Sequence, residues 1–172
     1  MKKNPDNMLQ KVIRWMYDGE IRFDWEDVVA LLEISQYYSI PQLNSDVMKF
    51  LDTNINEKNV LVLVRKCYEL ELDDILDDIL NDYLALFFRK IPIQELSDEL
   101  DVFEFAKVVK KVNLGLEEEV RCIMNFIGDY ETNDQEKNIL MKIFDNNTAE
   151  LKEILENNNI NWLPDSFIKS LK

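Results

Sequence analysis

The chain has 172 residues, enough for one compact domain with a small subdomain, and its 47% apolar content allows a buried core. Its net charge of −14 predicts repulsion of nucleic acids, and no apolar run of about 18 residues could span a bilayer, so we expect neither nucleic acid nor a membrane as a partner. It has no histidine and three glycines, which excludes histidine-based catalysis, histidine zinc sites and glycine-rich phosphate loops. We therefore expect no enzyme activity, no cofactor and no metal.

The first third of the chain is predicted to form helices joined by tight connections. Apolar residues at helical spacing predict helices over residues 8–17, 24–38 and 41–51, with a short extended stretch at 20–23. The first of these helices has one apolar face, made of Leu9, Val12, Ile13 and Met16. Gly19 ends this helix, Asp24 can cap the next, and Pro41 suits the first turn of the third.

Further helices are predicted along the rest of the chain. They are expected over residues 60–68, 72–84, 93–100, 102–112, 117–127, 139–144, 149–155 and 167–171. Pro92 separates two of them, and Gly115 is suited to a left-handed cap after residues 102–112. Short connections force neighbouring helices to pack antiparallel. We therefore predict an all-α fold of stacked antiparallel helix hairpins with at most one very short strand.

The first part of the chain resembles the second half of a BTB domain. The resemblance rests on an ordered set of short motifs, namely Tyr17-Asp18-Gly19-Glu20-Ile21, Leu31-Leu32, Tyr38-Ser39-Ile40 with Leu43, Phe50-Leu51 and Asn59-Val60. None of these motifs is specific alone, and the match comes from their order and spacing over about 50 residues. The resemblance implies a protein-interaction module at residues 1–56.

The remainder is similar to a BACK domain, the helical extension that commonly follows BTB. Its signature is matched by Leu114, Glu118-Glu119-Val120, Ile123 and Phe126-Ile127. Phe126 stands where the family usually has tryptophan. We expect the BACK-like region to cover residues 57–172.

The resemblance implies an adaptor that binds a protein partner, with a cullin of a ubiquitin ligase as one candidate. The alternative is a scaffold or oligomerisation module without a ubiquitin role. These residues do not contain the front half of a BTB domain, through which relatives form homo-oligomers, so we expect either a fragment or a descendant that lost this half. Its loss predicts an exposed apolar patch near Leu9, Val12 and Trp15.

Five residues are candidates for contact with a protein partner: Trp25, Tyr37, Asn59, Val60 and Tyr68. Trp25 is placed in a first helical turn beside two acidic residues, which favours a surface anchor, whereas core packing is the alternative for any tryptophan. Tyr37 and Tyr38 offer one ring to the core and one to the surface.

Two charged clusters are expected to be solvated helix faces. Asp73, Asp74, Asp77 and Asp78 lack the glycine turn and distal glutamate of a calcium loop. Lys107, Lys110 and Lys111 lie at helical spacing beside valines. The two cysteines, Cys67 and Cys122, are expected to be free thiols in the core, which predicts a reducing compartment, the cytoplasm or the nucleus.

Overall fold

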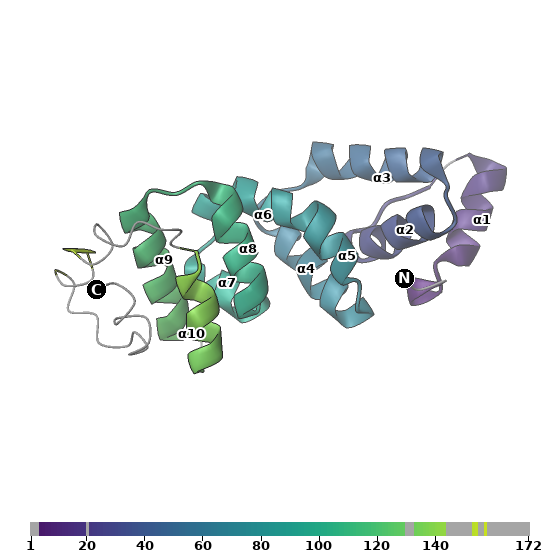
Figure 1. Ribbon diagram of the computed structural model, residues 1–172. Coiled ribbons are helices and arrows are strands. Elements are labelled where there is room, and N and C mark those ends of the chain that lie inside the picture. Colours follow the sequence, from purple (N-terminus) through teal and green to yellow (C-terminus); the bar gives the residue numbers. More distant parts are fainter. Residues whose placement is uncertain (1–3, 20, 130–132, 144–152, 155–156, 158–172) are drawn as a thin grey trace. The chain divides into compact units, whose positions relative to one another are not determined.

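The computed structural model describes residues 4–19, 21–129, 133–143, 153–154 and 157 (Figure 1). Within these residues every regular element is a helix and no strand forms, which confirms the predicted all-α class. The chain divides into two compact units, Met1–Lys90 and Ile91–Lys172. This division does not test the expected change from a BTB-like to a BACK-like region at residue 57, which stays a prediction.

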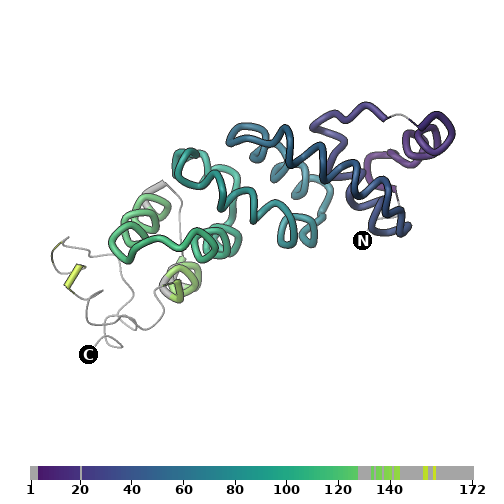
Figure 2. The backbone as a smooth tube through the Cα atoms, turned by 90° about the horizontal axis from the view of Figure 1, so that it is seen from above, coloured from purple at the N-terminus to yellow at the C-terminus, as the bar shows by residue number. Residues whose placement is uncertain are grey.

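The first unit is a set of short helices joined by turns of a few residues (Figures 1 and 2). In chain order its elements are the 3₁₀ turn η1 (Pro5–Asn7), α1 (Leu9–Asp18), α2 (Trp25–Tyr37), α3 (Pro41–Asn54), α4 (Asn59–Leu70), α5 (Asp73–Ile75), the π-helical turn η2 (Leu76–Leu80), α6 (Asn81–Phe87) and the 3₁₀ turn η3 (Phe88–Lys90). Elements α5, η2 and α6 follow one another without a break. They form the single helix that the sequence predicted over residues 72–84.

Helix α2 is the centre of this unit. It packs against α3 and α4 and also contacts η1 and α5. All residues from 28 to 35 are buried, because neighbours surround the helix. A helix that is apolar on nearly every side must be enclosed in this way. The buried Ser35 hydroxyl donates a hydrogen bond to the Leu32 carbonyl at 2.7 Å, so this polar group is satisfied inside the core.

Helix α1 differs, because Val12 is its only buried residue. The helix ends at Gly19, which has a left-handed conformation with φ +73° and donates its N–H to the Trp15 carbonyl at 2.8 Å. Residues 21–24 follow as a non-helical connection that pairs with no strand. Asp24 occupies the N-cap position of α2, as predicted. Its side chain makes no capping hydrogen bond, so only the position of the predicted cap is confirmed.

The π-helical turn η2 changes which residues of the long helix face the core. Ile79 and Tyr83 lie at helical spacing with the buried Leu76 and Leu80, but both are only half-buried. Asn81 and Phe88 are buried instead. A π turn closes its hydrogen-bonded ring over one residue more than an α turn. The buried face therefore moves forward by about one residue after η2.

The second unit contains α7 (Ile93–Glu99), α8 (Val102–Val112), α9 (Leu116–Asp129) and α10 (Asp134–Met141). Helix α7 packs on α9, and α8 packs on α10. The rings of Phe105 and Phe126 stack with centroids 3.9 Å apart, which joins α8 to α9. Asp101 caps α8 by accepting a hydrogen bond from the Glu104 N–H at 2.9 Å. The stacked rings therefore lie in the core of this unit, and the Asp101 cap fixes the start of α8.

Two local predictions in the second unit need correction. The left-handed residue after α8 is Asn113 with φ 53°, whereas Gly115 does not have a left-handed φ. Asparagine tolerates this conformation because its short side chain bonds locally. The helix predicted over residues 139–144 begins at Asp134, where Asn133 forms a capping box with Glu136.

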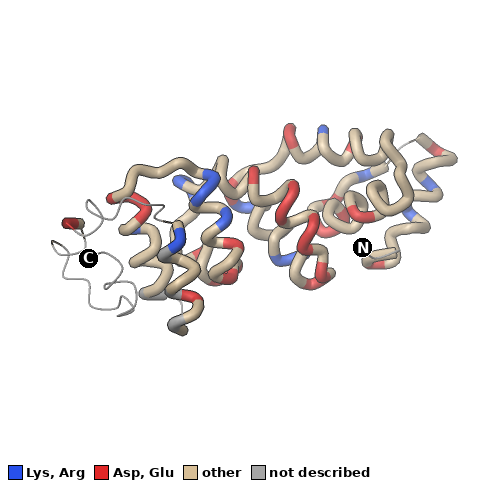
Figure 3. Tube along the Cα trace, in the orientation of Figure 1, with Lys and Arg blue, Asp and Glu red and all other residues tan. Residues whose placement is uncertain are grey.

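The predicted helix over residues 167–171 lies outside the described residues, as does most of the one over 149–155, of which residues 153 and 154 are described as helical. Both cysteines, Cys67 and Cys122, are free and buried, as expected. None of the described helices is long and apolar enough to cross a membrane. Charged residues of both signs occur along the helices of both units (Figure 3).

Candidate protein-interaction surface

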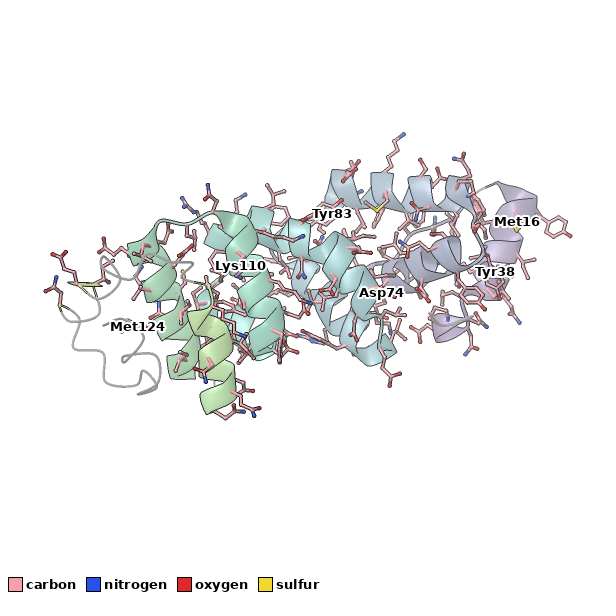
Figure 4. All side chains as sticks on the ribbon, viewed as in Figure 1. Met16, Tyr38, Asp74, Tyr83, Lys110 and Met124 are labelled. Carbon is pink, nitrogen blue, oxygen red and sulfur yellow. The ribbon has the colours of Figure 1, made fainter. Side chains whose placement is uncertain are left out.

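Helix α1 carries three exposed apolar side chains. Ile13 is 45% exposed, Met16 64% and Tyr17 87%. Their spacing of three and four residues places them on one face of the helix. Met16 can be seen on this face in Figure 4. We call these three residues the α1 face.

The α1 face corrects the patch predicted at Leu9, Val12 and Trp15. Val12 is buried, and the other two are half-buried against the unit. The prediction named the correct helix but not the residues of it that are exposed. Large apolar side chains gathered on one exposed face commonly mark an interaction site.

A groove of about 740 Å³ adjoins the end of α1. Its apolar lining comes from Trp15, Ile21, Phe23 and Phe50. Four charged residues also line it: Asp18, Arg22, Asp46 and Lys49. The groove therefore combines aromatic surface with charges of both signs, as protein-interaction sites often do.

Trp25 is half-buried beside this groove. Its ring lies 4.9 Å from that of Phe50, and the ring of Phe23 lies 5.1 Å from the same phenylalanine. The three rings fix the start of α2 against α3. Part of the indole surface is thus used within the chain, and its predicted role as a surface anchor stays a prediction.

Tyr37 and Tyr38 form a pair at the end of α2. Their rings meet edge to face with centroids 5.0 Å apart. Tyr37 is half-buried and Tyr38 is exposed, so the second ring has more surface free for a partner. Tyr38 is labelled in Figure 4. The sequence analysis selected Tyr37, the less exposed of the two.

Asn59 organises the connection between α3 and α4. Its side-chain oxygen accepts a hydrogen bond from the Asn56 N–H at 2.7 Å, and its Nδ2 donates to the Asn54 carbonyl at 3.1 Å. Val60 is fully buried, which places its side chain in the core and away from any partner in this structure. Tyr68, on α4, is half-buried. The structure therefore does not gather the five predicted residues into one surface.

Ion pairs and hydrogen bonds hold the N-terminal elements to the rest of the first unit. Lys66 of α4 pairs with Asp6 of η1 at 2.7 Å, and the hydrogen bond to Asp6 raises the pKa of this lysine above its ordinary value. Lys11 of α1 pairs with Asp27 of α2. These contacts fix the base of α1 while leaving the α1 face outside.

A second polar contact joins α3 to α6. Tyr83 donates a hydrogen bond to Asp52, and burial together with this bond raises the pKa of the tyrosine. Burial also raises the pKa of the Cys67 thiol to about 12. This cysteine is therefore protonated at neutral pH and packs as a small apolar group.

The charged clusters show no site geometry among the described residues. No group of three acidic or cysteine side chains there could hold a metal ion. Asp73, Asp74, Asp77 and Asp78 are exposed. On α8, Lys107 pairs with Glu104 at 2.7 Å, which fits the solvated face that the sequence predicted.

The family model of the BTB/POZ domain matches residues 4–55. This segment contains α1, α2 and α3, together with the α1 face and all the residues that line the groove. Domains of this family mediate protein–protein interactions and are not enzymes, so the match supports a protein-interaction module. None of the curated proteins or solved structures compared with the chain matches it.

Sequence reasoning placed Ile13 and Met16 of the α1 face in one apolar stripe, but it did not show that both stay exposed. The available signal was the number of large apolar residues on a helix of ten residues. Besides the predicted stripe, Trp15 and Tyr17 lie on other sides of the helix. One packing contact cannot cover apolar groups on several sides, so some of them had to remain outside.

Proposed function

We propose that the chain is a protein-interaction adaptor that binds the N-terminal region of a cullin scaffold within a ubiquitin ligase. The observation that supports this proposal most is the BTB/POZ match at residues 4–55, because relatives with this domain often serve as cullin adaptors. The same segment exposes apolar side chains and a groove with aromatic lining. In this proposal residues 57–172 are a BACK-like extension that spaces the adaptor from its substrate.

Calorimetry with a purified cullin N-terminal region tests the proposal. We expect saturable binding with a dissociation constant in the micromolar range or tighter, which corresponds to about −8 kcal/mol. A flat titration with folded protein would contradict it. The titration is to be run with several cullins, because a specific adaptor binds one of them in preference to the others.

Aromatic substitutions refine the test. Buried aromatic anchors commonly contribute about 2 kcal/mol or more to binding, so Trp25→Ala or Tyr37→Ala should weaken a genuine complex at least tenfold if these residues contact the cullin. Phe103→Ala is the control, since it removes an exposed ring that lies outside residues 4–55. Circular dichroism of each variant separates loss of binding from loss of folding.

The second candidate function is a scaffold or oligomerisation module with no role in ubiquitination. The exposed α1 face favours it, because an apolar helix face can associate with another protein without any cullin. If the chain self-associates and does not bind a cullin, the result would favour the scaffold or oligomerisation function. Either function suits the cytoplasm or the nucleus, which microscopy of a fluorescent fusion would test.

A further inference from the structure

We infer that α8 carries a docking surface for a short acidic helical segment of a partner protein, one that also has an apolar side chain. Four side chains make up this surface, which we call the α8 face: Phe103, Lys107, Lys110 and Lys111. The lysines follow Phe103 at four, seven and eight residues, so all four side chains lie along one side of the helix. All four are exposed, and Lys110 is labelled in Figure 4.

Phe103 is the side chain that a merely solvated helix face does not explain. Its ring is 57% exposed, and among the described residues of the second unit it is the only exposed large apolar side chain. A helix face turned to water is normally polar, whereas aromatic rings are enriched in the centres of protein interfaces. The ring therefore offers the apolar centre of a contact, and the lysines offer its polar rim.

The charge of the α8 face is opposite to that of the chain as a whole. The chain has 34 acidic and 20 basic residues, yet the only acidic residue within α8 is Glu104. Glu104 is buried and pairs with Lys107 at 2.7 Å, so this helix exposes no carboxylate among its lysines (Figure 3). Attraction to the helix dipole explains Lys110 and Lys111 in the last turn. It explains neither Lys107 nor the exposed ring.

The dimensions of the α8 face indicate which kind of partner fits it. From Phe103 to Lys111 the face is about 12 Å long, because an α-helix rises 1.5 Å per residue. Nucleic acid gains affinity from many phosphate contacts, and three lysines supply few of them on a chain whose net charge of −14 repels polyanions. A helical segment with carboxylates four and seven residues from an apolar side chain matches the spacing. Its carboxylates pair with the lysines while its apolar side chain covers the ring.

This docking surface goes beyond the proposed cullin role. Helix α8 lies outside residues 4–55, which the BTB/POZ family model matches. Binding of an acidic segment to α8 and binding of a cullin are thus separate events. Failure of either experiment leaves the result of the other intact.

An NMR titration of the full isotope-labelled chain tests the α8 face. The probe is an alanine-based helical peptide with one leucine and, on each side of it, glutamates four and seven residues away, so that it fits in either orientation. We expect saturable shifts of the α8 amides with a dissociation constant on the order of 100 μM, because the contact is much smaller than a standard interface. The same peptide with glutamine in place of glutamate should not bind. Absence of shifts in α8, or equal binding of the glutamine peptide, would overturn the inference.

Substitutions separate the charge from the ring. Lys110→Glu should weaken peptide binding by about fivefold, because one attraction becomes a repulsion. Lys58→Glu is its control, since it makes the same charge change at an exposed lysine beside α4. Phe103→Ala should weaken binding about tenfold, and Leu86→Ala is its control, because Leu86 is 70% exposed on α6. Equal losses in a variant and its control would show that the peptide does not use the α8 face.

Single-stranded RNA distinguishes an acidic peptide from a general polyanion. A short oligouridylate titrated in the same way should leave the α8 amides unshifted. If it shifts them as the peptide does, the choice of an acidic protein segment is wrong. An amide spectrum that is unchanged away from the substituted residue shows that each variant remains folded.

Discussion

Helices α1 and α2 follow each other in the chain, but they differ in how many of their apolar side chains are buried. Residues 28–35 of α2 are all buried, whereas α1 buries Val12 alone and exposes three large apolar residues. Both helices lie within the segment similar to a BTB/POZ domain. Apolar content alone therefore does not separate a core helix from a helix that presents a surface. The number of neighbouring elements separates them, because α2 is enclosed by α3, α4 and α5.

The largest effect that this contrast predicts is the loss of stability from truncating α2. Leu32→Ala should lower the free energy of unfolding by about 2–5 kcal/mol, because a fully buried leucine loses its transfer free energy and leaves a cavity. Urea denaturation at low protein concentration measures this difference. Met16→Ala is the control on α1 and should stay within about 0.5 kcal/mol of the wild type. Similar losses for both variants would show that α1 is as much a core helix as α2.

A smaller effect is expected at the end of α1. Gly19 has φ +73°, and a Cβ atom added there would meet nothing within 4 Å. Gly19→Ala should therefore cost about 1–2 kcal/mol through backbone strain alone. Gly19→Asn should cost less, since asparagine tolerates this conformation. Gly115→Ala is the control, because that glycine has equally open space and no left-handed φ, and its free energy of unfolding should not fall.

The smallest effect concerns the ion pair that ties η1 to α4. The pKa of Lys66 is raised in the folded chain, so the charged lysine stabilises the fold below its ordinary pKa of 10.5, and this stabilisation is lost as the pH rises through the folded value. Asp6→Asn should cost about 0.2–1 kcal/mol at pH 8. The difference in free energy of unfolding between Asp6→Asn and the wild type should shrink above pH 10.5.

A charge-matched control is needed for that comparison. The chain carries a net charge of −14, so removing any acidic group reduces the repulsion among its negative charges and stabilises the fold. Asp78→Asn provides it, since Asp78 is exposed and pairs with none of the described basic residues. A pH dependence equal to that of Asp6→Asn would mean that the ion pair contributes nothing specific.

Much of the fold could be predicted from the sequence. Apolar spacing, together with signals such as Pro41 and Gly19, located α1 to α9 closely because these are local effects of backbone sterics and one-sided burial. The correct helix was also identified as the one with an apolar patch. Which residues of that helix stay exposed was not predictable, since it depends on which neighbour covers Val12.

The individual contact residues were less accessible to sequence reasoning. Val60 was chosen from a motif, but motif positions are often core positions, and this one is fully buried. Likewise, the choice of Tyr37 over Tyr38 depends on where α2 ends relative to α3. These assignments follow from tertiary packing, which a single sequence does not specify residue by residue.

The π-helical turn at Leu76–Leu80 has a consequence for how this chain tolerates changes in length. Its wider ring holds one residue more than a regular helical repeat. Deleting a single residue from this turn would leave an ordinary α-helix whose two ends keep their present phase. A deletion elsewhere in the same helix would rotate Leu84 and Phe88 out of the core. The long helix thus contains one turn from which a residue can be deleted while the side chains after it keep their places in the core.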